Sequence, residues 1–492
     1  MKKENEENKK IKFPEPNKLL TAKPSLKKYL KYLLFFGPGA VVASMTIGQG
    51  QLIFGPQIGG WAGFSLLWLI TINIGSYIIA YVGCRFTMLS GIGVMDLFAF
   101  KTRKGWLNWL FMAIMLFFIP IFTASIITTL GQSLAWVTGF GHYLWWGIGF
   151  CLLAGILVMG GRYKMLEFTQ VFFVAVLGIG ALVSVLVIAP NLVEVIPNFF
   201  TIGNVPSSFP DYPNWVMNDY PGVASTPIPL AMLGYLGTLT FTIITLVGYT
   251  GWIKVKKWGI FRGRDDSESF SQNMLNSLIK YGKIRYLSEK KEDVKKSRIS
   301  LKPLLIDLSL AFLIVSVVSA SYMISGAELL QPRHTLPEDT RLIQEQVKIF
   351  TYLADWLKPL FQISVVFALF GTVYAGFEAA TRMLYETGRH MHKKIKNIRY
   401  KRFMLFLLVY LLSTGIPISI LMYRGLSVLA MLSLTLMFIG VVGVVMYGVG
   451  IVYLSQKVLP DKYKLGGFAL AASIIGIFLL MIPIFFLFSL LI

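Results

Sequence analysis

The sequence predicts an all-α polytopic membrane protein. Of its 492 residues, 55% are hydrophobic and only 14% are charged, whereas soluble domains carry about 25% charged residues. Such a chain has more apolar surface than one water-surrounded core can bury, so a soluble enzyme is excluded and the lipid bilayer is the expected partner. The two cysteines, Cys84 and Cys151, lie in separate hydrophobic runs and can form neither a disulfide framework nor a metal cluster.

Eleven hydrophobic segments are long enough to cross the membrane, because about 20 apolar residues span roughly 30 Å of hydrocarbon. In chain order the predicted spans are residues 32–57, 62–84, 107–130, 144–160, 166–188, 230–252, 303–324, 359–385, 403–423, 426–454 and 465–492. We therefore expect about 11 transmembrane helices.

The distribution of basic residues predicts the orientation. With the N-terminus inside, all but five of the 46 Lys and Arg residues fall on the inner side, and the long outer segment 191–226 contains none. This asymmetry is typical of cytoplasmic loops, and it explains the net charge of +22 without a nucleic-acid partner. We expect a plasma-membrane protein with a cytoplasmic N-terminus and an extracytoplasmic C-terminus.

The first predicted span is interrupted at its middle by Thr46-Ile47-Gly48-Gln49-Gly50-Gln51. Each glycine lowers helix stability by about 1 kcal/mol relative to alanine, and amides at bilayer depth need hydrogen-bond partners. An unwound stretch that lines a cavity satisfies both conditions. The alternative is a face of small residues that packs against a neighbouring helix.

The sixth span carries a similar interruption at Gly234–Thr242, followed by Thr245 and Gly248. Paired breaks in corresponding segments of two halves indicate a midplane site in transporters with inverted repeats, so the eleven spans are interpreted as five plus five plus one. The expected organisation is a basic N-terminal segment (1–31), a first repeat (32–190), an extracytoplasmic loop (191–226), a second repeat (227–455) with a basic cytoplasmic loop (253–302), and a final loop and helix (456–492). The predicted substrate-binding residues are Thr46, Gly48, Gln49, Gln51, Thr240, Phe241, Thr242 and Thr245.

Three short motifs resemble the Nramp family of proton-coupled divalent-metal transporters. They are Gly37-Pro38-Gly39 with Gln57 and Gly59 after the first break, the element Arg162-Tyr163-Lys164-Met165-Leu166-Glu167 before the fifth span, and Gly234 with Gly237 in the sixth. The resemblance implies the LeuT-like fold of the APC superfamily, with substrate held between the unwound parts of helices one and six. It also implies secondary active transport without a cofactor.

The sequence departs from this family at the metal ligands. The family has Asp-Pro-Gly-Asn in the first break, where this chain has Gly48-Gln49-Gly50-Gln51, and its Met-Pro-His falls on Phe241-Thr242-Ile243. Transition metals prefer carboxylate, imidazole and sulfur donors, so no conventional ligand set is present and Gln49 and Gln51 offer weak contacts at most. Neutral oxygens suit a hydrated hard cation such as Mg²⁺, which keeps several waters, or a small polar organic solute.

Ionisable residues inside predicted spans are the remaining candidates, because burying them is unfavourable and they often mark ion pathways. Glu378, Arg382 and Glu386 are spaced four residues apart on one helix face, where they form either a structural ion ladder or a proton or gating path. Asp307 lies about one turn inside the seventh span. It either contributes to transport or reaches the membrane interface.

These features predict a secondary transporter whose default cargo is a divalent metal cation, with possible proton coupling. A carrier of an amino acid or another small polar solute on the same fold is the first alternative. A non-transporting membrane sensor, with the basic loop 254–302 as its output surface, is the second. An enzyme is not expected, because no span brings a nucleophile together with a base.

Overall fold

The computed structural model describes residues 10–160, 163–338, 344, 347–389, 391, 392, 395 and 397–489. The side chains of Gln49 and of residues 163–171, 173, 174 and 177 lie outside this description. Of the predicted Arg162 to Glu167 element, only the helical backbone from Tyr163 onward is described. The described chain is helical apart from one isolated β-bridge between Ile11 and Leu287. This confirms the all-α prediction.

The first half of the chain contains the helices of the first five predicted spans. They are α4 (Pro38–Met45), η2 (Thr46–Gln51) and α5 (Phe54–Ala62), then α6 (Trp68–Ile72) and α7 (Ile74–Ser90), then α9 (Trp106–Thr138), α10 (Tyr143–Met159) and α11 (Tyr163–Ile188). Shorter helices precede and connect them: α2 (Lys18–Thr21), α3 (Leu26–Lys31), η1 (Tyr32–Phe35), α8 (Val94–Lys101) and η3 (Arg103–Gly105). The segment between the halves holds α12 (Leu192–Phe200), α13 (Asn214–Asp219) and α14 (Pro221–Ala224).

The second half begins with another broken span and ends with the eleventh helix. Its long helices are α15 (Ile228–Leu239) and α16 (Ile243–Val255), α19 (Lys302–Leu329), α21 (Leu357–Gly388), α23 (Tyr400–Tyr423), α24 (Val428–Leu436) with η8 (Met437–Val442) and α25 (Gly443–Val458), and α26 (Gly467–Phe488). The shorter ones are η4 (Gly259–Phe261), α17 (Ser267–Tyr281), α18 (Lys291–Ser300), η5 (Gln331–Arg333), α20 (Val347–Thr351) and η9 (Asp461–Tyr463).

Length and composition make this a polytopic membrane protein. Among the described residues, eight helices are long and apolar enough to cross a bilayer, and the bent pair Leu26–Phe35 and Pro38–Gly48, at 63°, adds a ninth. The apolar helices α10 and α11 coincide with the two remaining predicted spans. Helices therefore occur at all eleven predicted positions.

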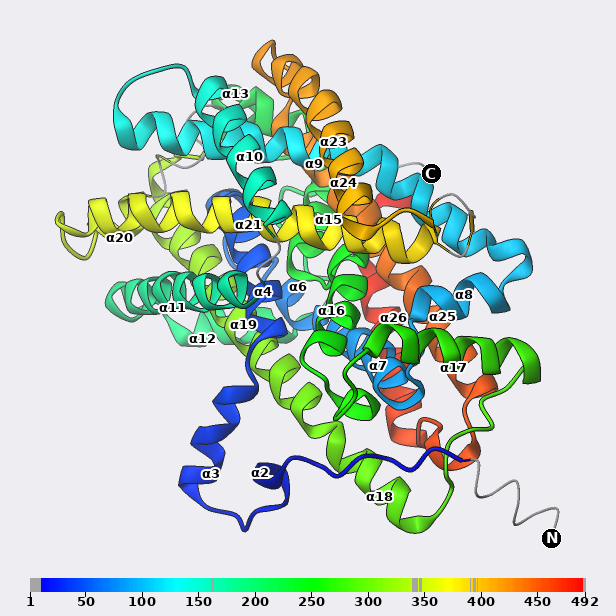
Figure 1. Cartoon of the computed structure of the whole chain (residues 1–492). Helices are drawn as coiled ribbons and strands as arrows, with labels where there is room; N and C mark the ends of the chain where they lie inside the picture. The colour runs from blue at the N-terminus through cyan, green and yellow to red at the C-terminus, as the bar shows by residue number, and fades with distance from the viewer. Residues whose placement is uncertain are drawn as a thin grey trace, which may run out of the picture.

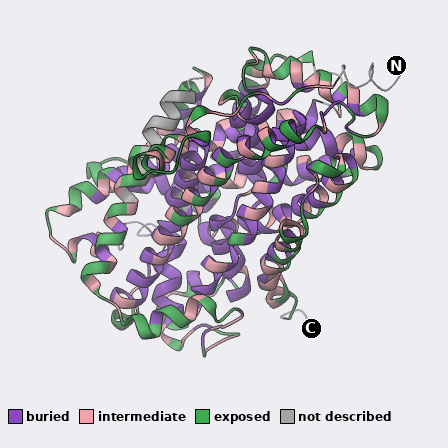
Figure 2. Ribbon diagram, turned by 90° about the horizontal axis from the view of Figure 1, so that it is seen from below, coloured by how far each residue is buried: buried purple, intermediate pink, exposed green. Residues whose placement is uncertain are grey.

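Burial separates an inner group of helices from an outer group (Figures 1 and 2). The span Ile228–Phe261 contains α15 and α16, and 89% of the residues in its most apolar stretch are buried. The corresponding share is 33% for α23 and 28% for α26. Since α23 and α26 expose mainly apolar side chains, these two helices face lipid. The broken span α15 and α16 lies at the centre of the bundle.

One end of the molecule carries the N-terminal segment with α2 and α3 and the loop with α17 and α18, and we call it the basic side. In Figure 1 the labels of α2, α3 and α18 are at the bottom. The loop and the N-terminal segment are joined there by the bridge between Ile11 and Leu287 and by an ion pair from Lys296 to Glu15 at 2.7 Å. That this side is cytoplasmic stays a prediction from the charge distribution.

Candidate functional site

The first break occupies the residues that the sequence indicates, but it is not unwound as predicted, because the chain there continues as a wide helical turn. The helix α4 ends at Met45, a wider π-helical turn covers Thr46–Gln51, and α5 begins at Phe54. A Cβ atom on Gly48 would lie 2.1 Å from the hydroxyl oxygen of Thr372 on α21, and one on Gly50 would lie 2.4 Å from Cβ of Thr238 on α15. The glycines are therefore required because the break packs directly against two other helices.

The second break is shorter than predicted and begins later. The helix α15 continues through Gly234 and Gly237 to Leu239, and only Thr240, Phe241 and Thr242 lie outside helix before α16 starts. Thr240 and Thr242 have extended backbones, with ψ of 155° and 160°. Threonine tolerates this conformation well, because β-branched residues favour extended backbone over helix.

The backbone groups freed by the second break are satisfied by two polar side chains, Asn73 just before α7 and Ser76 in its first turn. The Asn73 amide donates to the Leu239 carbonyl at 2.9 Å, and the Phe241 N–H donates to the Ser76 hydroxyl at 3.2 Å. Ser76 in turn donates to Asn73 at 2.7 Å. Buried backbone groups need such partners, so α7 holds the break open. The sequence analysis missed Ser76, which has no signal beyond being a lone serine in an apolar helix.

A third irregularity, absent from the prediction, lies in the tenth span. The π-helical segment η8 joins α24 to α25, and its Gly440 approaches α15 so closely that a Cβ atom there would lie 2.6 Å from Cα of Gly237. The Thr240 hydroxyl donates to the Gly440 carbonyl at 2.8 Å. The second break is thereby fixed to the tenth span, and Gly440 beside Gly443 was the only sequence signal.

A central cavity of about 50 Å³ lies between the two breaks. Its polar wall consists of Thr46, Thr238, Thr240, Thr242, Thr245 and, on α9, Thr123, while the rest is mainly apolar and comes from α9, α21, α24 and η8. About 10–15 Å³ accommodates the centre of one water molecule, so the cavity has room for a few waters in this conformation.

The hydroxyl groups of the cavity wall differ in how far they are already engaged. Thr123, Thr238 and Thr240 donate to backbone carbonyls of the helices. Thr242 and Thr245 place their hydroxyl oxygens 3.2 Å apart at the start of α16. The Thr46 hydroxyl makes no hydrogen bond within the described part of the chain. The Thr245 hydroxyl also donates to the Thr242 carbonyl at 2.9 Å, and the Thr242 hydroxyl accepts from the Thr245 N–H at 3.3 Å. Thr46 is therefore the least engaged oxygen donor of the wall.

Four of the eight predicted binding residues line the cavity, and three lie elsewhere. Thr46, Thr240, Thr242 and Thr245 are in the wall, whereas Gly48, Gln51 and Phe241 are not. The Gln51 side chain is fully buried and accepts from the Tyr235 hydroxyl at 3.3 Å, because the wide turn directs it toward α15. Phe241 packs its ring edge-on against Tyr77 at 4.7 Å. The Gln49 side chain lies outside the described residues.

Met45 was missed as a wall residue, because it lies one position before the glycine and glutamine run. Its thioether is the only sulfur donor among the described wall residues, and none of those residues is Asp, Glu, His or Cys. No group of three or more such side chains occurs anywhere in the described residues. The donors that face the cavity are consequently neutral.

Asp307 caps the broken first helix, a role that the sequence analysis did not assign to it. Its carboxylate accepts from the backbone N–H of Gly37 at 2.8 Å and of Gly39 at 2.7 Å, and it also accepts from the hydroxyl of Tyr249 on α16. A carboxylate at a helix N-terminus is stabilised by unpaired N–H groups and by the helix dipole. Asp307 thus joins α19 to the basic-side halves of both broken spans.

The Asp307 contact also explains the Gly37-Pro38-Gly39 motif. A Cβ atom on Gly39 would lie 2.8 Å from a carboxylate oxygen of Asp307, so a larger residue would displace the cap. Pro38 occupies the first turn of α4, where its missing N–H is tolerated. The motif therefore forms a helix N-terminus whose backbone N–H groups are capped by Asp307.

Glu378 and Arg382 form an ion pair within α21, while Glu386 does not extend the predicted ladder. The Arg382 guanidinium donates to Glu378 at 2.7 Å and 3.1 Å. Gly251 of α16 packs onto Arg382, since a Cβ atom there would lie 2.2 Å from Arg382 Cδ. Glu386 instead pairs with Arg389 at 2.9 Å. The other carboxylate oxygen of Glu378 is buried and has no hydrogen-bond partner among the described residues. Whether the pair is structural or part of a gating path stays a prediction.

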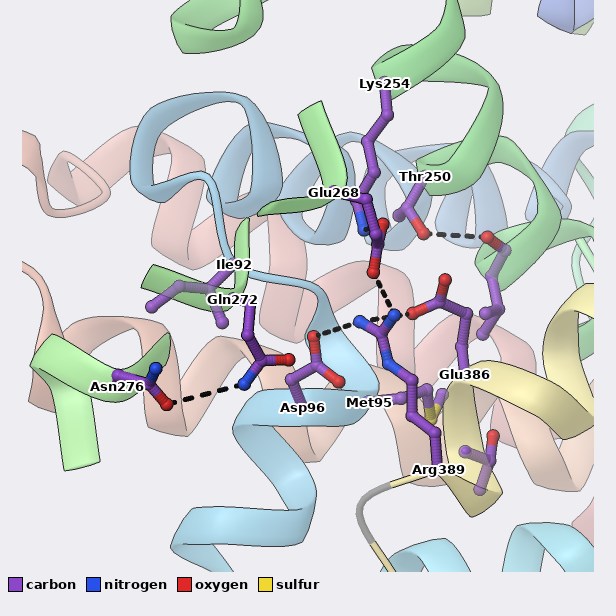
Figure 3. A network of polar contacts seen from close by, with 12 residues as sticks. Ile92, Met95, Asp96, Thr250, Lys254, Glu268, Gln272, Asn276, Glu386 and Arg389 are labelled. Carbon is purple, nitrogen blue, oxygen red and sulfur yellow. Dashed lines mark hydrogen bonds and ion pairs between the residues drawn. The ribbon is translucent and has the colours of Figure 1, made fainter. Parts of the chain in front are cut away.

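A partly buried charge network joins four helices on the basic side, and Figure 3 shows its members. Arg389, just beyond α21, contacts Asp96 on α8 at 3.0 Å and Glu386 at 2.9 Å, and it also pairs with Glu268 on α17. Glu268 accepts from Lys254 of α16 at 3.0 Å. The network therefore connects α8, α16, α17 and α21. The sequence shows the charges of this region, but no local pattern pairs residues so distant along the chain.

Within this network, burial acts to raise the pKa of Glu268, but the nearby Lys254 and Arg389 outweigh it and hold that pKa below its usual value. A carboxyl group whose pKa is lowered by folding stabilises the folded state at pH values above its usual pKa. This stabilisation is lost as the pH falls through the lowered pKa. The Glu268 contacts should hence persist at neutral pH and weaken only in acid.

We expect Glu268→Gln to loosen α17 from the bundle. Hydrogen exchange of the α17 backbone amides should accelerate about threefold, a modest factor because the Glu268 side chain is 53% exposed and solvent screens its ion pairs. Asp265→Asn is the matched control, since Asp265 is fully exposed and, among the described residues, forms its ion pair with Lys257 alone, at 3.5 Å. Equal exchange in both variants would contradict the network's role.

The chain matches one protein-family profile and is similar in fold to solved transporter structures. The sequence profile described as natural resistance-associated macrophage protein-like, Nramp, matches residues 39–489. A crystal structure of a variant of the Eremococcus coleocola manganese transporter is similar to this chain, with a TM-score of 0.58 and 15% identity over 94% of this chain and 87% of that one. The same transporter bound to an aromatic bis-isothiourea compound gives 0.58 and 14% over the same shares.

These structural likenesses concern the fold, which is the LeuT-like arrangement predicted from the sequence. No curated protein matches the chain in sequence.

Proposed function

The chain belongs to the Nramp family, and from this premise we propose that it carries a divalent cation, with part of its hydration shell, through the central cavity between the two breaks. Family membership makes the protein a secondary membrane transporter and not an enzyme. The observation that supports this cargo is the wall of the cavity, whose donors are neutral oxygens with the single thioether of Met45.

Ligand chemistry favours a hard, hydrated ion over a bare transition metal. Mn²⁺ and Fe²⁺ are usually held by carboxylate, imidazole or sulfur donors after losing water, and one thioether without a carboxylate is a poor substitute. Mg²⁺ dehydrates reluctantly and keeps several waters. The hydroxyls of Thr46, Thr242 and Thr245 can accept hydrogen bonds from such waters. We therefore propose Mg²⁺ as the best representative of the cargo.

The two candidate proton carriers lie outside the cavity wall, so the proposed mechanism has no proton-transfer step. Asp307 and Glu378, the two candidates for proton coupling, are engaged by the start of α4 and by Arg382 respectively. Neither residue contributes to the cavity wall. We propose that Asp307 holds helices together, and that Arg382 serves as the partner of Glu378 within α21.

The deciding experiment is uptake into proteoliposomes of the purified chain, with Mg²⁺, Mn²⁺ and amino acids offered separately and a pH probe inside. Saturable Mg²⁺ uptake is the expected result. Uptake of an amino acid alone would replace the proposal by an organic-solute carrier, and absence of any flux would favour a sensor. Acidification of the lumen with Mg²⁺ entry would show that protons are coupled through other groups.

We expect Thr46→Ala to raise the Km for Mg²⁺ uptake about fivefold, because one hydrogen bond in a partly buried site contributes about 1 kcal/mol. Met45→Leu should leave Mg²⁺ uptake unchanged, since a hard cation gains little from sulfur. The matched control is Thr138→Ala, whose hydroxyl bonds only the end of its own helix and the following residues. Loss of uptake in Met45→Leu with none in Thr46→Ala would indicate a softer, dehydrated metal.

A further inference from the structure

A basic pocket of about 680 Å³ lies on the basic side, away from the central cavity. It is formed by the end of α17, the segment 283–289 and the chain that follows α25. Five cationic side chains and two carboxylates line it: Lys10, Lys283, Arg285, Lys457, Lys464, Glu289 and Asp461. The excess of positive charge suits an anionic ligand.

Three of these cations have no carboxylate partner in the part of the chain that the structure describes. Lys464 pairs with Asp461 at 2.7 Å, and Lys10 lies 3.8 Å from Glu289. Within the described residues, no ion pair involves Lys283, Arg285 or Lys457. Two of them lie near aromatic rings: Arg285 is 5.8 Å from the ring centre of Tyr281, and Lys457 is 5.6 Å from that of Tyr453. These three side chains are thus available to a ligand.

The positive charge of this region affects the pKa values of two neighbouring groups, Lys101 and Asp461. Partial burial, together with repulsion from Lys457 and Lys283, lowers the pKa of Lys101 at the end of α8. Hydrogen bonding to Lys464, supported by its charge and by that of Lys283, lowers the pKa of Asp461. Both directions agree with an excess of cations around the pocket.

An apolar groove of about 800 Å³ meets this pocket at Lys457, which lines both. The groove runs between α25 and α26, and apart from Gln456 and Lys457 its lining is apolar or aromatic. Val449 is 54% exposed, Tyr453 62% and Phe478 61%, and α26 is the least buried of the spanning helices. The groove therefore opens toward the hydrocarbon of the bilayer.

We propose that the pocket and groove together bind an anionic phospholipid from the leaflet on the basic side. Its phosphate lies among Lys283, Arg285 and Lys457, and an acyl chain lies in the groove between α25 and α26. A water-soluble anion would leave the groove unused, and a zwitterionic lipid would bring its own cation toward three unpaired ones. Each Lys or Arg near an anionic surface contributes attraction, and the groove adds the fit of an acyl chain.

The test uses the full chain in detergent, with lipid binding measured by native mass spectrometry. The ligands are dioleoylphosphatidylglycerol, dioleoylphosphatidylcholine and glycerol 3-phosphate, so that the headgroup charge and the acyl chain are varied separately. The pocket variant is Lys283→Gln with Lys457→Gln. Its control is Lys401→Gln with Arg402→Gln, which removes two charges at the basic-side end of α23, outside both cavities.

We expect the pocket variant to weaken phosphatidylglycerol binding at least about tenfold, since two attractive charges are lost, and the control to leave binding within about twofold. Val449→Trp, which fills the groove, should also weaken it, whereas Leu405→Trp on the lipid-facing surface of α23 should not. Three results would each overturn the lipid site. The first is equal binding of the two lipids, and the second is the same loss of affinity in both charge variants. The third is competition by glycerol 3-phosphate while Val449→Trp has no effect. Mg²⁺ uptake is not read in this test, so its outcome is independent of the cargo.

Discussion

Gly50→Ala should reduce uptake at least about tenfold, because position 50 is where the two broken spans touch. A Cβ atom there would lie 2.4 Å from Cβ of Thr238, about 1 Å inside ordinary contact. Neither atom can rotate away, since a Cβ position is fixed by the backbone. Overpacking of this kind typically destabilises by about 1–3 kcal/mol, and here it would also separate the walls of the central cavity.

The size effect can be isolated with compensating and neutral variants. Thr238→Gly removes the opposing Cβ, so the double variant Gly50→Ala with Thr238→Gly should regain part of the uptake relative to Gly50→Ala alone. Gly149→Ala is the matched control, because a Cβ atom at Gly149 of α10 would meet nothing within 4 Å. Proteoliposome uptake is measured at equal protein content, alongside the melting temperature. Normal uptake in Gly50→Ala would show that the two breaks need not touch.

The sequence predicted the fold because its signals are local. Hydrophobic length places each span, and glycines within an apolar run mark a break, so η2 falls on the predicted Thr46–Gln51. The second break was placed too early because Gly234 and Gly237 have another purpose. They allow Ser433 and η8 to approach α15, and this reason exists only once the two helices are packed together.

The candidate site was harder to predict, because the direction of a side chain depends on the geometry of the break. The wide turn rotates the Gln51 side chain away from the cavity and toward Tyr235. The regular spacing of an α-helix does not predict this direction. Asp307 bonds to residues about 270 positions away, and Arg389 to Asp96 across 293. No periodicity in the sequence specifies such pairs.

Asp307→Ala should be among the most destabilising single substitutions in the chain. It removes the acceptor of two backbone N–H groups and of the Tyr249 hydroxyl, in a position with no exposure to solvent. A buried donor left without a partner costs about 1–3 kcal/mol. Three such losses imply a large fall in melting temperature and uptake reduced to background, since the basic-side halves of both broken spans lose their common attachment.

A graded series distinguishes this cap from a proton-carrying role for Asp307. Asp307→Asn keeps a neutral acceptor oxygen and should retain part of the stability, Tyr249→Phe removes only one donor and should have a smaller effect, and Asp355→Ala, at an exposed carboxylate before α21, should have none. For a cap, uptake at every pH should follow the stability order of the variants. A proton carrier would give a different pattern, in which Asp307→Asn folds as well as the unmodified chain yet loses the pH dependence of its uptake. That pattern would contradict the cap as the role of Asp307 and would assign it to proton exchange during transport.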